Sequence, residues 1–533
     1  MRIAGESSTQ DVAITRFLLA ILITVMYRYA ADGTEELLSM PEYEESAEVA
    51  EELAKERWEG YWDKKTFKES PVNTYLEQWR DRFYLVHETH PFYQAPESFW
   101  YAGETPATKR SPAKPLYRGT QYETAETLVG SLKASSQEST SKHFYVETGE
   151  DVKRLKLDVA ARWLIHAMNY CFNIKKQGTA EEKKTLQRVG IGHLGKFGVV
   201  MYEGKNLFET LMVNATLLDI HGALFGPPAP AWERKQVRCI QAHDIPQPDN
   251  LPELYTMQSR LFRLSVKDDL VCGYNVMNGE FTDTTNLLVE PMALWRIDSK
   301  KEHERKDYLM QRQDFSRAMW RNFPQLLQEG KGESGLVKWM RFLEKNGLIG
   351  KDGSGFFTLK TTAMGYDKMS YVYVDNYTDS ITMAMDLMEE AGTTQRGWVL
   401  ESVKAIEEIS TKHIGNLARE ITAVIYGEGT KNTTQVGTRM RSEYFALMDS
   451  PFRTWAASLK KDSKRDIYEA WTNTMCNIAM TVANNEIDRQ ETQMFQYKPG
   501  KKGKHTMLNA LNLYTAMVAK YRLKEGDDTA NGK

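Results

Sequence analysis

The chain has 533 residues and a formal net charge of −3, with 41% hydrophobic and 26% charged residues. This length predicts more than one domain with an ample core, and the composition is ordinary for a globular protein. The charge excludes a generally basic nucleic-acid coat, so any nucleic acid must be bound through local patches or together with other subunits. The four cysteines form no CxxC pair, which argues against a zinc ribbon or disulfide framework and favours a reducing cytoplasm.

The first strongly apolar segment is 17–27, FLLAILITVMY. Its eleven residues are too few to span a bilayer. Glu6 and Asp11 precede it, so the region before it is a poor basic segment for a signal peptide. With residues 7–10 as a helix cap, we predict a buried helix.

Two histidines, His87 and His90, follow a helix expected after Pro71. A zinc-binding HExxH pair needs i, i+4 spacing on one helix face, whereas these residues are three apart and Pro91 follows at once. We therefore favour a structural turn. The alternative is a metal-dependent hydrolase that would use both histidines with a carboxylate such as Glu88.

An aromatic segment, 142–149 (KHFYVETG), follows a long Pro-, Ser- and Thr-rich connection over 95–141. Adjacent Phe144 and Tyr145, flanked by cations, could stack on bases or wedge into a groove. The alternative, which the residues alone favour, is a strand end that buries Phe144. A helix is expected next, over 158–172.

The stretch 188–204, RVGIGHLGKFGVVMYEG, is rich in glycine and has basic residues between the glycines. It leads into an expected strand at 199–202 and a helix at 205–218. A flexible basic loop on such a scaffold is suited to contact a phosphate backbone or a shallow groove. Taken alone, however, the glycine-rich sequence favours a simple connecting segment. Its spacing matches neither a Walker loop nor a dinucleotide fingerprint.

Short strands are expected at 261–266, 270–276 and 292–297, in a half-exposed mixed sheet. A strand–turn segment at 364–371 presents Lys368 and Met369 at its tip. From residue 395 onward the spacing is helical and predicts four amphipathic helices. The predicted fold class is therefore α+β, with an irregular, loop-rich mixed α/β domain over 1–378 and an antiparallel four-helix bundle over 379–533.

Several landmarks occur in a fixed order along the chain. They are HPFYQ at 90–94, the aromatic segment, the glycine-rich unit, LYTMQSR at 254–260, EPM at 290–292 and PFRTW at 451–455. In this order they resemble the large subunit of type I-E CRISPR Cascade, the CasA family, over essentially the whole chain. Family members carry several tens of residues before the segment matching 3–6, so the N-terminal domain is expected to be short here.

The resemblance implies a non-enzymatic subunit without cofactor or metal. Such a subunit reads the protospacer-adjacent motif (PAM) on double-stranded DNA, helps to open the duplex and offers a docking surface to a helicase–nuclease. Its partners would be the other Cascade subunits, the crRNA, the target DNA and that effector, in the cytoplasm and without a membrane. A metal-dependent hydrolase and a purely scaffolding helical protein are the alternatives.

The resemblance also assigns residues to three sites. The DNA-reading glycine loop comprises Arg188, Gly190, Gly192, His193 and Lys196. The loop that anchors the subunit near the 5′ end of the guide comprises Phe144, Tyr145 and Val146, and the duplex wedge comprises Lys368, Met369 and Ser370. The family places amides at the wedge, so this chain departs there. A further groove-reading lysine of some members would fall at 278–280, where this chain has none, and that role is not transferred.

Overall fold

The structure is a computed structural model. It describes residues 2–41, 46–68, 70–104, 112, 115–117, 119–122, 153–172, 190–235, 245–298, 307–327, 334–349, 355–368, 373–387, 393–427, 432–490, 498–500 and 503–522. The chain forms two compact units, one of Met1–Arg317, Glu329–Ile349 and Thr358–Ser380, and one of Ala318–Gln328, Gly350–Phe357 and Ile381–Lys533. The boundary at 378/379 stays a prediction, and two earlier segments group with the C-terminal unit.

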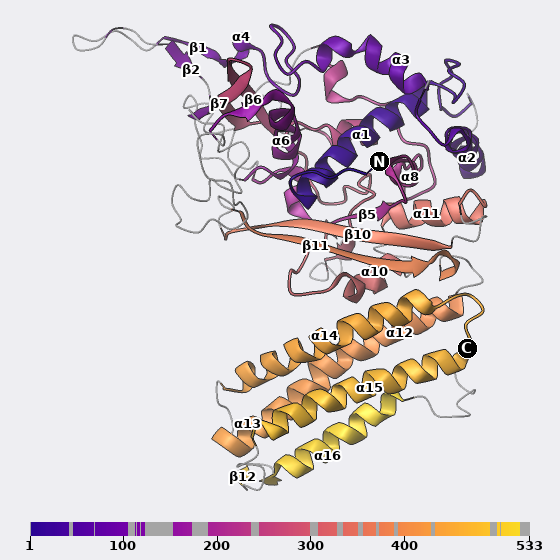
Figure 1. The fold of residues 1–533 in the computed structure, drawn as a ribbon, viewed down its shortest axis with the longest axis vertical. Coiled ribbons are helices and arrows are strands. Elements are labelled where there is room, and N and C mark those ends of the chain that lie inside the picture. Colours follow the sequence, from indigo (N-terminus) through magenta and orange to yellow (C-terminus); the bar gives the residue numbers. More distant parts are fainter. Residues whose placement is uncertain are drawn as a thin grey trace. The chain divides into compact units, whose positions relative to one another are not determined.

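The first unit combines short helices and small antiparallel sheets (Figure 1). Its helical elements are α1 (Ser8–Arg28), α2 (Ala47–Lys64), α3 (Pro71–Gln78), η1 (Arg80–Arg82), α4 (Glu97–Trp100), α6 (Leu157–Tyr170), η4 (His193–Lys196), α8 (Leu207–Asn214), η5 (Ala231–Glu233), α9 (Leu251–Tyr255) and α11 (Gly335–Lys345). Its strands are β1 (Tyr101–Glu104), β2 (Pro115–Tyr117), β3 (Thr120–Tyr122), β4 (Leu155–Lys156), β5 (Val199–Glu203), β6 (Arg260–Lys267), β7 (Leu270–Asn278), β8 (Trp295–Ile297) and β9 (Tyr308–Met310).

Helix α1 is the central element of this unit. The Ser7 side chain caps it by accepting from the backbone N–H of Gln10, so the helix begins nine residues before the apolar run at 17–27. It is long and apolar enough to cross a membrane, but 78% of its most apolar window is buried inside the protein. The predicted buried helix is therefore confirmed. α1 packs against α9 and lies beside α6 (Figure 1).

Strand β7 pairs with β6 along its length, with β3 through Tyr274–Val276 and with β4 through Leu270 and Val271. The predicted strands at 261–266 and 270–276 are confirmed, whereas the third is restricted to 295–297. β7 is buried on both faces from Gly273 to Asn278 rather than half-exposed, because the unit packs on both sides of it. The second sheet has the order β11-β10-β5, with β10 (Phe356–Tyr366) antiparallel to β5 and followed by β11 (Tyr373–Ala384).

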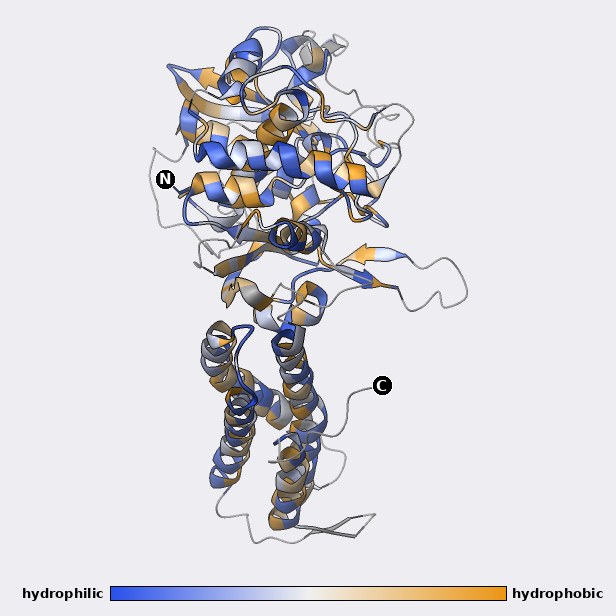
Figure 2. Ribbon diagram, turned by 90° about the vertical axis from the view of Figure 1, so that its right-hand side faces the viewer, coloured by the Kyte–Doolittle hydropathy of each residue, from blue (hydrophilic) through white to orange (hydrophobic). Residues whose placement is uncertain are grey.

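The second unit contains the predicted four-helix bundle, whose helices carry hydrophilic and hydrophobic residues mixed along their length (Figure 2). Its elements are η8 (Met319–Asn322), α10 (Phe323–Leu327), η9 (Met385–Leu387), α12 (Thr393–Glu408), the π-helical η11 (Ile409–Ile414), α13 (Gly415–Tyr426), α14 (Asn432–Ser458), α15 (Arg465–Asp488), the hairpin β12 (Lys498–Gly500) and β13 (Gly503–His505), α16 (Met507–Val518) and η13 (Ala519–Tyr521). α12, η11 and α13 form one rod, and α13 packs on α14 and α16, which both pack on α15. Stacked Trp455 and Trp471, 4.6 Å apart between ring centroids, fill its core.

Candidate nucleic-acid interface

The glycine loop places its two principal glycines in different environments. Gly190 has φ +63°, and no described residue lies within 4 Å of the position of a Cβ there. Gly192 donates its N–H to the Cys171 carbonyl at 2.8 Å, and a Cβ there would stand 2.3 Å from the Asn169 carbonyl oxygen. Gly190 is therefore the open position of the loop, whereas Gly192 is required for internal packing.

The C-terminal end of α6 holds both the glycine loop and the flanks of the β10–β11 hairpin. The hydroxyl of Tyr366 donates to the Tyr170 carbonyl at 2.6 Å, and the hydroxyl of Tyr373 donates to the same carbonyl. A Cβ on Gly195 would stand 2.3 Å from the Tyr366 hydroxyl, so the loop packs directly against the hairpin. The structure thus brings the predicted glycine loop and the base of the predicted wedge together at one helix end.

A buried arginine closes the start of this loop. Arg260, fully buried at the beginning of β6, donates to the Gly190 carbonyl at 2.5 Å and to the Phe172 carbonyl at 2.7 Å. It also donates to the carbonyl of Ser259 at 2.7 Å. One guanidinium therefore joins the open glycine to Phe172, the second residue after α6, and fixes the loop without using a side chain of the loop itself.

His193 lies inside the protein and does not face solvent. Its side chain is 2% exposed, and its Nε2 lies 3.0 Å from an oxygen of Glu290. Burial lowers the pKa of His193, although the hydrogen bond to Glu290 opposes this shift. The histidine anchors the loop from within, so we no longer expect its ring to touch DNA.

Glu290 is the acceptor at the centre of a buried charge network. Arg16 of α1 binds it through two hydrogen bonds of 2.8 Å each and lies over the ring of Tyr255 at 3.9 Å. Burial alone would raise the pKa of Glu290, but the charge of Arg16 and the hydrogen bonds from His193 and Arg16 outweigh it and lower the pKa to about 2. The glycine loop is thereby tied through His193 to the central helix.

Lys196 supplies a half-buried cation behind the loop. Burial lowers its pKa to about 8, and the neighbouring charge of Arg260 acts in the same direction, while Asp283 opposes it. The ammonium group therefore still carries most of its charge at neutral pH. Such a cation favours an anionic ligand at this loop.

The wedge lies partly within the described residues. Lys368 is exposed two residues after β10, whereas Met369 and Ser370 lie outside the described residues. Arg188 of the glycine loop and the anchoring residues Phe144, Tyr145 and Val146 also lie outside them. The segment 278–280, to which no role was transferred, is internal, since a Cβ on Gly279 would stand 2.0 Å from the Gln258 carbonyl oxygen.

The two histidines near residue 90 form the predicted turn. Nδ1 of His87 accepts the backbone N–H of His90 at 3.0 Å and that of Thr89 at 3.3 Å. Within the described part of the chain, no group of three His, Cys, Asp or Glu side chains is arranged to hold a metal ion.

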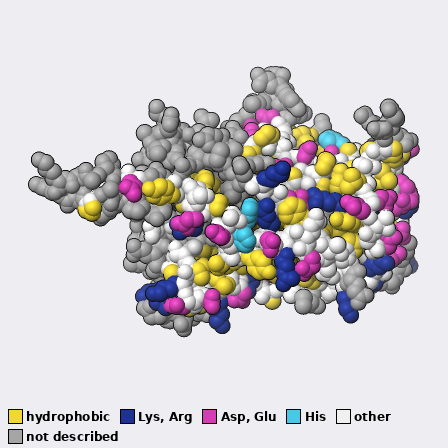
Figure 3. Space-filling view, turned by 90° about the horizontal axis from the view of Figure 1, so that it is seen from above, with side chains coloured by type: hydrophobic (Ala, Val, Ile, Leu, Met, Phe, Trp, Pro, Cys, Tyr) yellow, Lys and Arg dark blue, Asp and Glu magenta, His cyan; other side chains and the backbone are white. Residues whose placement is uncertain are grey.

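On the face in Figure 3, basic and acidic side chains are interspersed without a broad field of one sign, so anion binding depends on local groups.

The sequence model of the family described as CRISPR-associated protein Cse1 matches residues 1–482. The chain belongs to the Cse1 family. This confirms the resemblance to the CasA large subunit that the ordered landmarks indicated. A comparison with curated protein sequences finds no match.

Solved structures share the fold of this Cse1-family chain. The crystal structure of Thermobifida fusca Cse1 is 21% identical with a TM-score of 0.72, over 98% of this chain and 92% of that one. Cse1 from Acidimicrobium ferrooxidans is 19% identical with a TM-score of 0.69, over 98% and 91%. A chain of a CRISPR RNA-guided surveillance complex is 13% identical with a TM-score of 0.64, over 96% and 90%.

Sequence reasoning missed the residues that position this Cse1-family loop. Glu290 and Arg260 stand within two of the recognised landmarks, EPM and LYTMQSR, but neither had been given a role. Arg16 directly precedes the apolar run at 17–27 and was given no role either. The structure buries it fully, and a fully buried cation requires a buried partner. The two tyrosines that flank the wedge, Tyr366 and Tyr373, carried no signal in the sequence, because their shared acceptor lies about 200 residues earlier.

Proposed function

We propose that this chain is the large subunit of a type I-E RNA-guided surveillance complex and that it acts without catalysis. In this role it reads the PAM on double-stranded DNA, starts strand separation and offers a docking surface to a helicase–nuclease. Membership of the Cse1 family and the likeness in fold to a chain of a CRISPR RNA-guided surveillance complex support the proposal. Its partners would then be the other Cascade subunits, the crRNA and the target duplex, in the cytoplasm.

The convergence of the glycine loop and the hairpin on α6 is the observation that carries this proposal. Tyr170 accepts from Tyr366 and Tyr373 on either side of the wedge, while Gly192 packs against the preceding peptide. A loop that reads a duplex and a wedge that opens it must be held at a fixed separation, since DNA presents the two features at a fixed spacing. A common anchor at one helix end supplies that separation.

Base pairing with a guide carries the sequence information in such a complex, so the protein needs to read only a short signal. The minor groove distinguishes little beyond A·T and G·C, which suits a loop that approaches through a glycine backbone. Gly190 provides this surface because no described residue lies within 4 Å of its Cβ position and its carbonyl is held by Arg260. Lys196 and the exposed Lys368 provide local positive charge near the loop and the wedge.

The glycine loop is tested by Gly190→Asp, which adds a side chain and an anion to the proposed groove-facing position. Guide-loaded complex containing the variant should bind PAM-containing duplex more weakly by about tenfold or more in a gel shift, because an anion faces phosphate. Gly33→Asp is the matched control, since Gly33 also has positive φ (+97°) and open space. Equal affinity of the two variants would exclude the glycine loop as the DNA-reading element.

The wedge and the anchoring loop remain proposals for Lys368, Met369 and Ser370, and for Phe144, Tyr145 and Val146. If Phe144 anchors the subunit, Phe144→Ala should lower its proportion in the purified complex. Full stoichiometry with that variant would remove the anchoring role. If the whole complex binds its duplex equally well without this chain, a purely scaffolding protein becomes the better account.

A further inference from the structure

The first unit contains a pocket of about 780 Å³, and none of the described residues proposed to read DNA lines it. It lies between η1 and the turn at 88–91 on one side and the segment 231–235 on the other. This volume is in the range of pockets that bind small organic ligands, and it is far larger than a single phosphate group requires.

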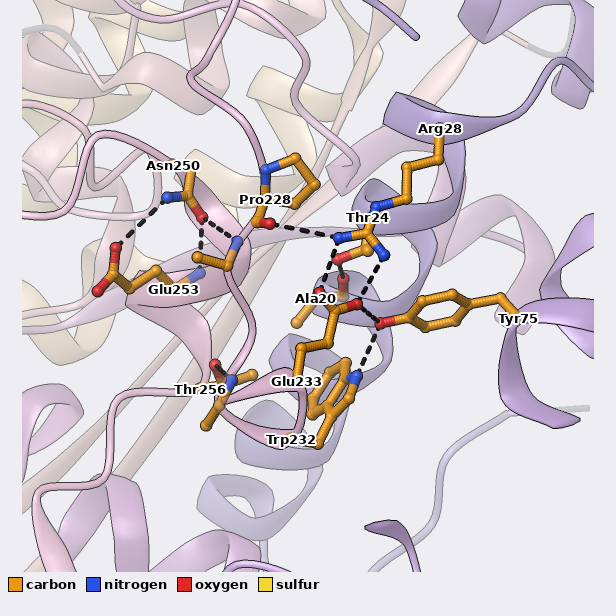
Figure 4. A network of polar contacts seen from close by, with 12 residues as sticks. Ala20, Thr24, Arg28, Tyr75, Pro228, Trp232, Glu233, Asn250, Glu253 and Thr256 are labelled. Atoms are coloured by element: carbon orange, nitrogen blue, oxygen red, sulfur yellow. Dashed lines mark hydrogen bonds and ion pairs between the residues drawn. The ribbon is translucent and has the colours of Figure 1, made fainter. Parts of the chain in front are cut away.

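A polar network fixes one wall of the pocket (Figure 4). The indole N–H of Trp232 donates to the Tyr75 hydroxyl at 2.7 Å, and that hydroxyl donates to Glu233 at 2.5 Å. Glu233 also accepts two hydrogen bonds from Arg28 of α1, at 2.8 and 2.7 Å. The segment that carries these two residues is therefore held by α1 and α3 before any ligand arrives.

The opposite wall is fixed equally well. The side chain of Gln94 donates to the Leu85 carbonyl at 2.8 Å and accepts the backbone N–H of Leu264 at 2.8 Å. His87 accepts the N–H of His90, which closes the turn on the rim. A ligand would meet a formed pocket and would not have to order its walls.

Several polar groups that line the pocket are uncommitted within the described part of the chain. Gln258 is 7% exposed, and its side-chain amide makes no hydrogen bond to any described residue. On the rim, Arg82 and Lys235 form no ion pair with a described side chain. The half-buried ring of Phe99 supplies an aromatic surface. Two exposed carboxylates, Glu88 and Glu97, also line the pocket, and Glu97 is paired with Arg263.

We propose that this pocket holds one unpaired nucleotide of a single-stranded nucleic acid. The base would stack on Phe99 and place its edge on the amide of Gln258, which offers both a donor and an acceptor. The phosphate would lie on the rim with Arg82 and Lys235. An inorganic anion would leave the ring and the amide unused, and an apolar ligand would leave the two cations and the amide unused. This site is separate from the proposed duplex contact at Gly190.

The test measures fluorescence anisotropy of labelled oligonucleotides of about ten residues with the purified full-length chain. The double variant Arg82→Ala/Lys235→Ala should bind single strands about tenfold more weakly, through loss of phosphate contacts. The control is Lys267→Ala/Lys345→Ala, which removes the same charge from exposed positions outside the pocket lining and should change binding little. Thermal melting checks that all variants are folded.

An oligonucleotide made entirely of abasic sites keeps the phosphates and removes the bases. It should bind several-fold more weakly than the intact strand, because stacking and the amide contact are lost. Preference for RNA would assign the nucleotide to a guide, and preference for DNA to a displaced strand. Equal losses in the two double variants, or equal binding of the abasic strand, would overturn the proposal. Displacement by an acidic peptide but not by mononucleotides would do so as well.

Gly190→Asp separates this test from that of the proposed function. It should weaken duplex binding by the complex while leaving single-strand binding by the isolated chain unchanged. The pocket variant Arg82→Ala/Lys235→Ala should weaken single-strand binding by the isolated chain and leave duplex binding by the complex unchanged. Failure of one proposal is therefore recognisable without failure of the other.

Discussion

Replacing Glu290 by glutamine would test the buried network that supports the glycine loop. The substitution keeps the shape of the side chain and removes its charge. Arg16, which is 1% exposed, would then lose the carboxylate that binds both of its terminal nitrogens, and His193 would lose its anionic acceptor. An uncompensated cation would remain in the centre of the first unit.

The size of the effect follows from the ionisation of Glu290. A carboxyl whose pKa falls from 4.5 to about 2 on folding stabilises the folded state by about 3 kcal/mol at neutral pH. Removing one partner of a buried ion pair costs a similar amount, about 3–5 kcal/mol. The stabilisation is fully present above pH 4.5 and is lost as the pH falls from 4.5 toward 2. The glutamine variant should lack this part of the acid dependence.

Urea denaturation followed by tryptophan fluorescence measures the loss, with the transition of the first unit compared between variants because the chain has two units. Glu77→Gln is the matched control, since Glu77 is 70% exposed in its pair with Arg80 and its loss should change stability by less than about 1 kcal/mol. The double variant Arg16→Met/Glu290→Leu should be more stable than Glu290→Gln, because no charge stays buried. Equal midpoints for Glu290→Gln and Glu77→Gln would refute this reasoning.

Three further predictions concern the same region. Gly192→Ala should lower stability by about 1–3 kcal/mol, because a Cβ would overlap the Asn169 carbonyl. Gly190→Ala should cost about 1 kcal/mol of backbone strain. Melting curves in which Gly190→Ala is the less stable variant would contradict the tight packing at Gly192. Burial lowers the pKa of His166 to about 3, so the folded state resists protonation, and acidification from pH 7 to pH 5 should destabilise the protein by about 2 kcal/mol more than it destabilises His166→Gln. Urea midpoints of both proteins at the two pH values check this prediction. An equal change in midpoint for the unaltered protein and for His166→Gln would exclude it. Tyr373→Phe removes a donor to the carbonyl at the end of α6. It should reduce opening of a 2-aminopurine-labelled duplex while leaving duplex affinity unchanged, and unaltered fluorescence would argue against a shared anchor.

The fold class and the larger elements could be predicted from the sequence, because their signals are local. The apolar run at 17–27 indicated a buried helix, and α1 is that helix. Helical spacing after residue 395 indicated the bundle that α12 to α16 form. The limits of elements were less accurate. The expected helix at 205–218 ends at Asn214, whose side chain bonds the backbone of Tyr202 and turns the chain away.

The candidate site was predicted less completely. The glycine-rich sequence indicated a loop, but it could not show that Gly190 is open and Gly192 is packed, since the difference depends on where α6 ends. His193 reads in the sequence as a basic side chain of the loop, whereas the fold buries it against Glu290. Residue type reports what a side chain can do, and burial decides which of those uses remains.

The sequence by itself determined the family, the α+β class and the segments that carry the loop and the hairpin, because periodicity and ordered motifs are properties of the chain. Tertiary structure alone decided which of these segments meet. Tyr170 receives hydroxyl groups from residues 196 and 203 positions later, and Arg16 reaches a carboxylate 274 positions away. Contacts over such separations are set by how the helices and sheets pack around one core, and local residue patterns carry no record of that packing.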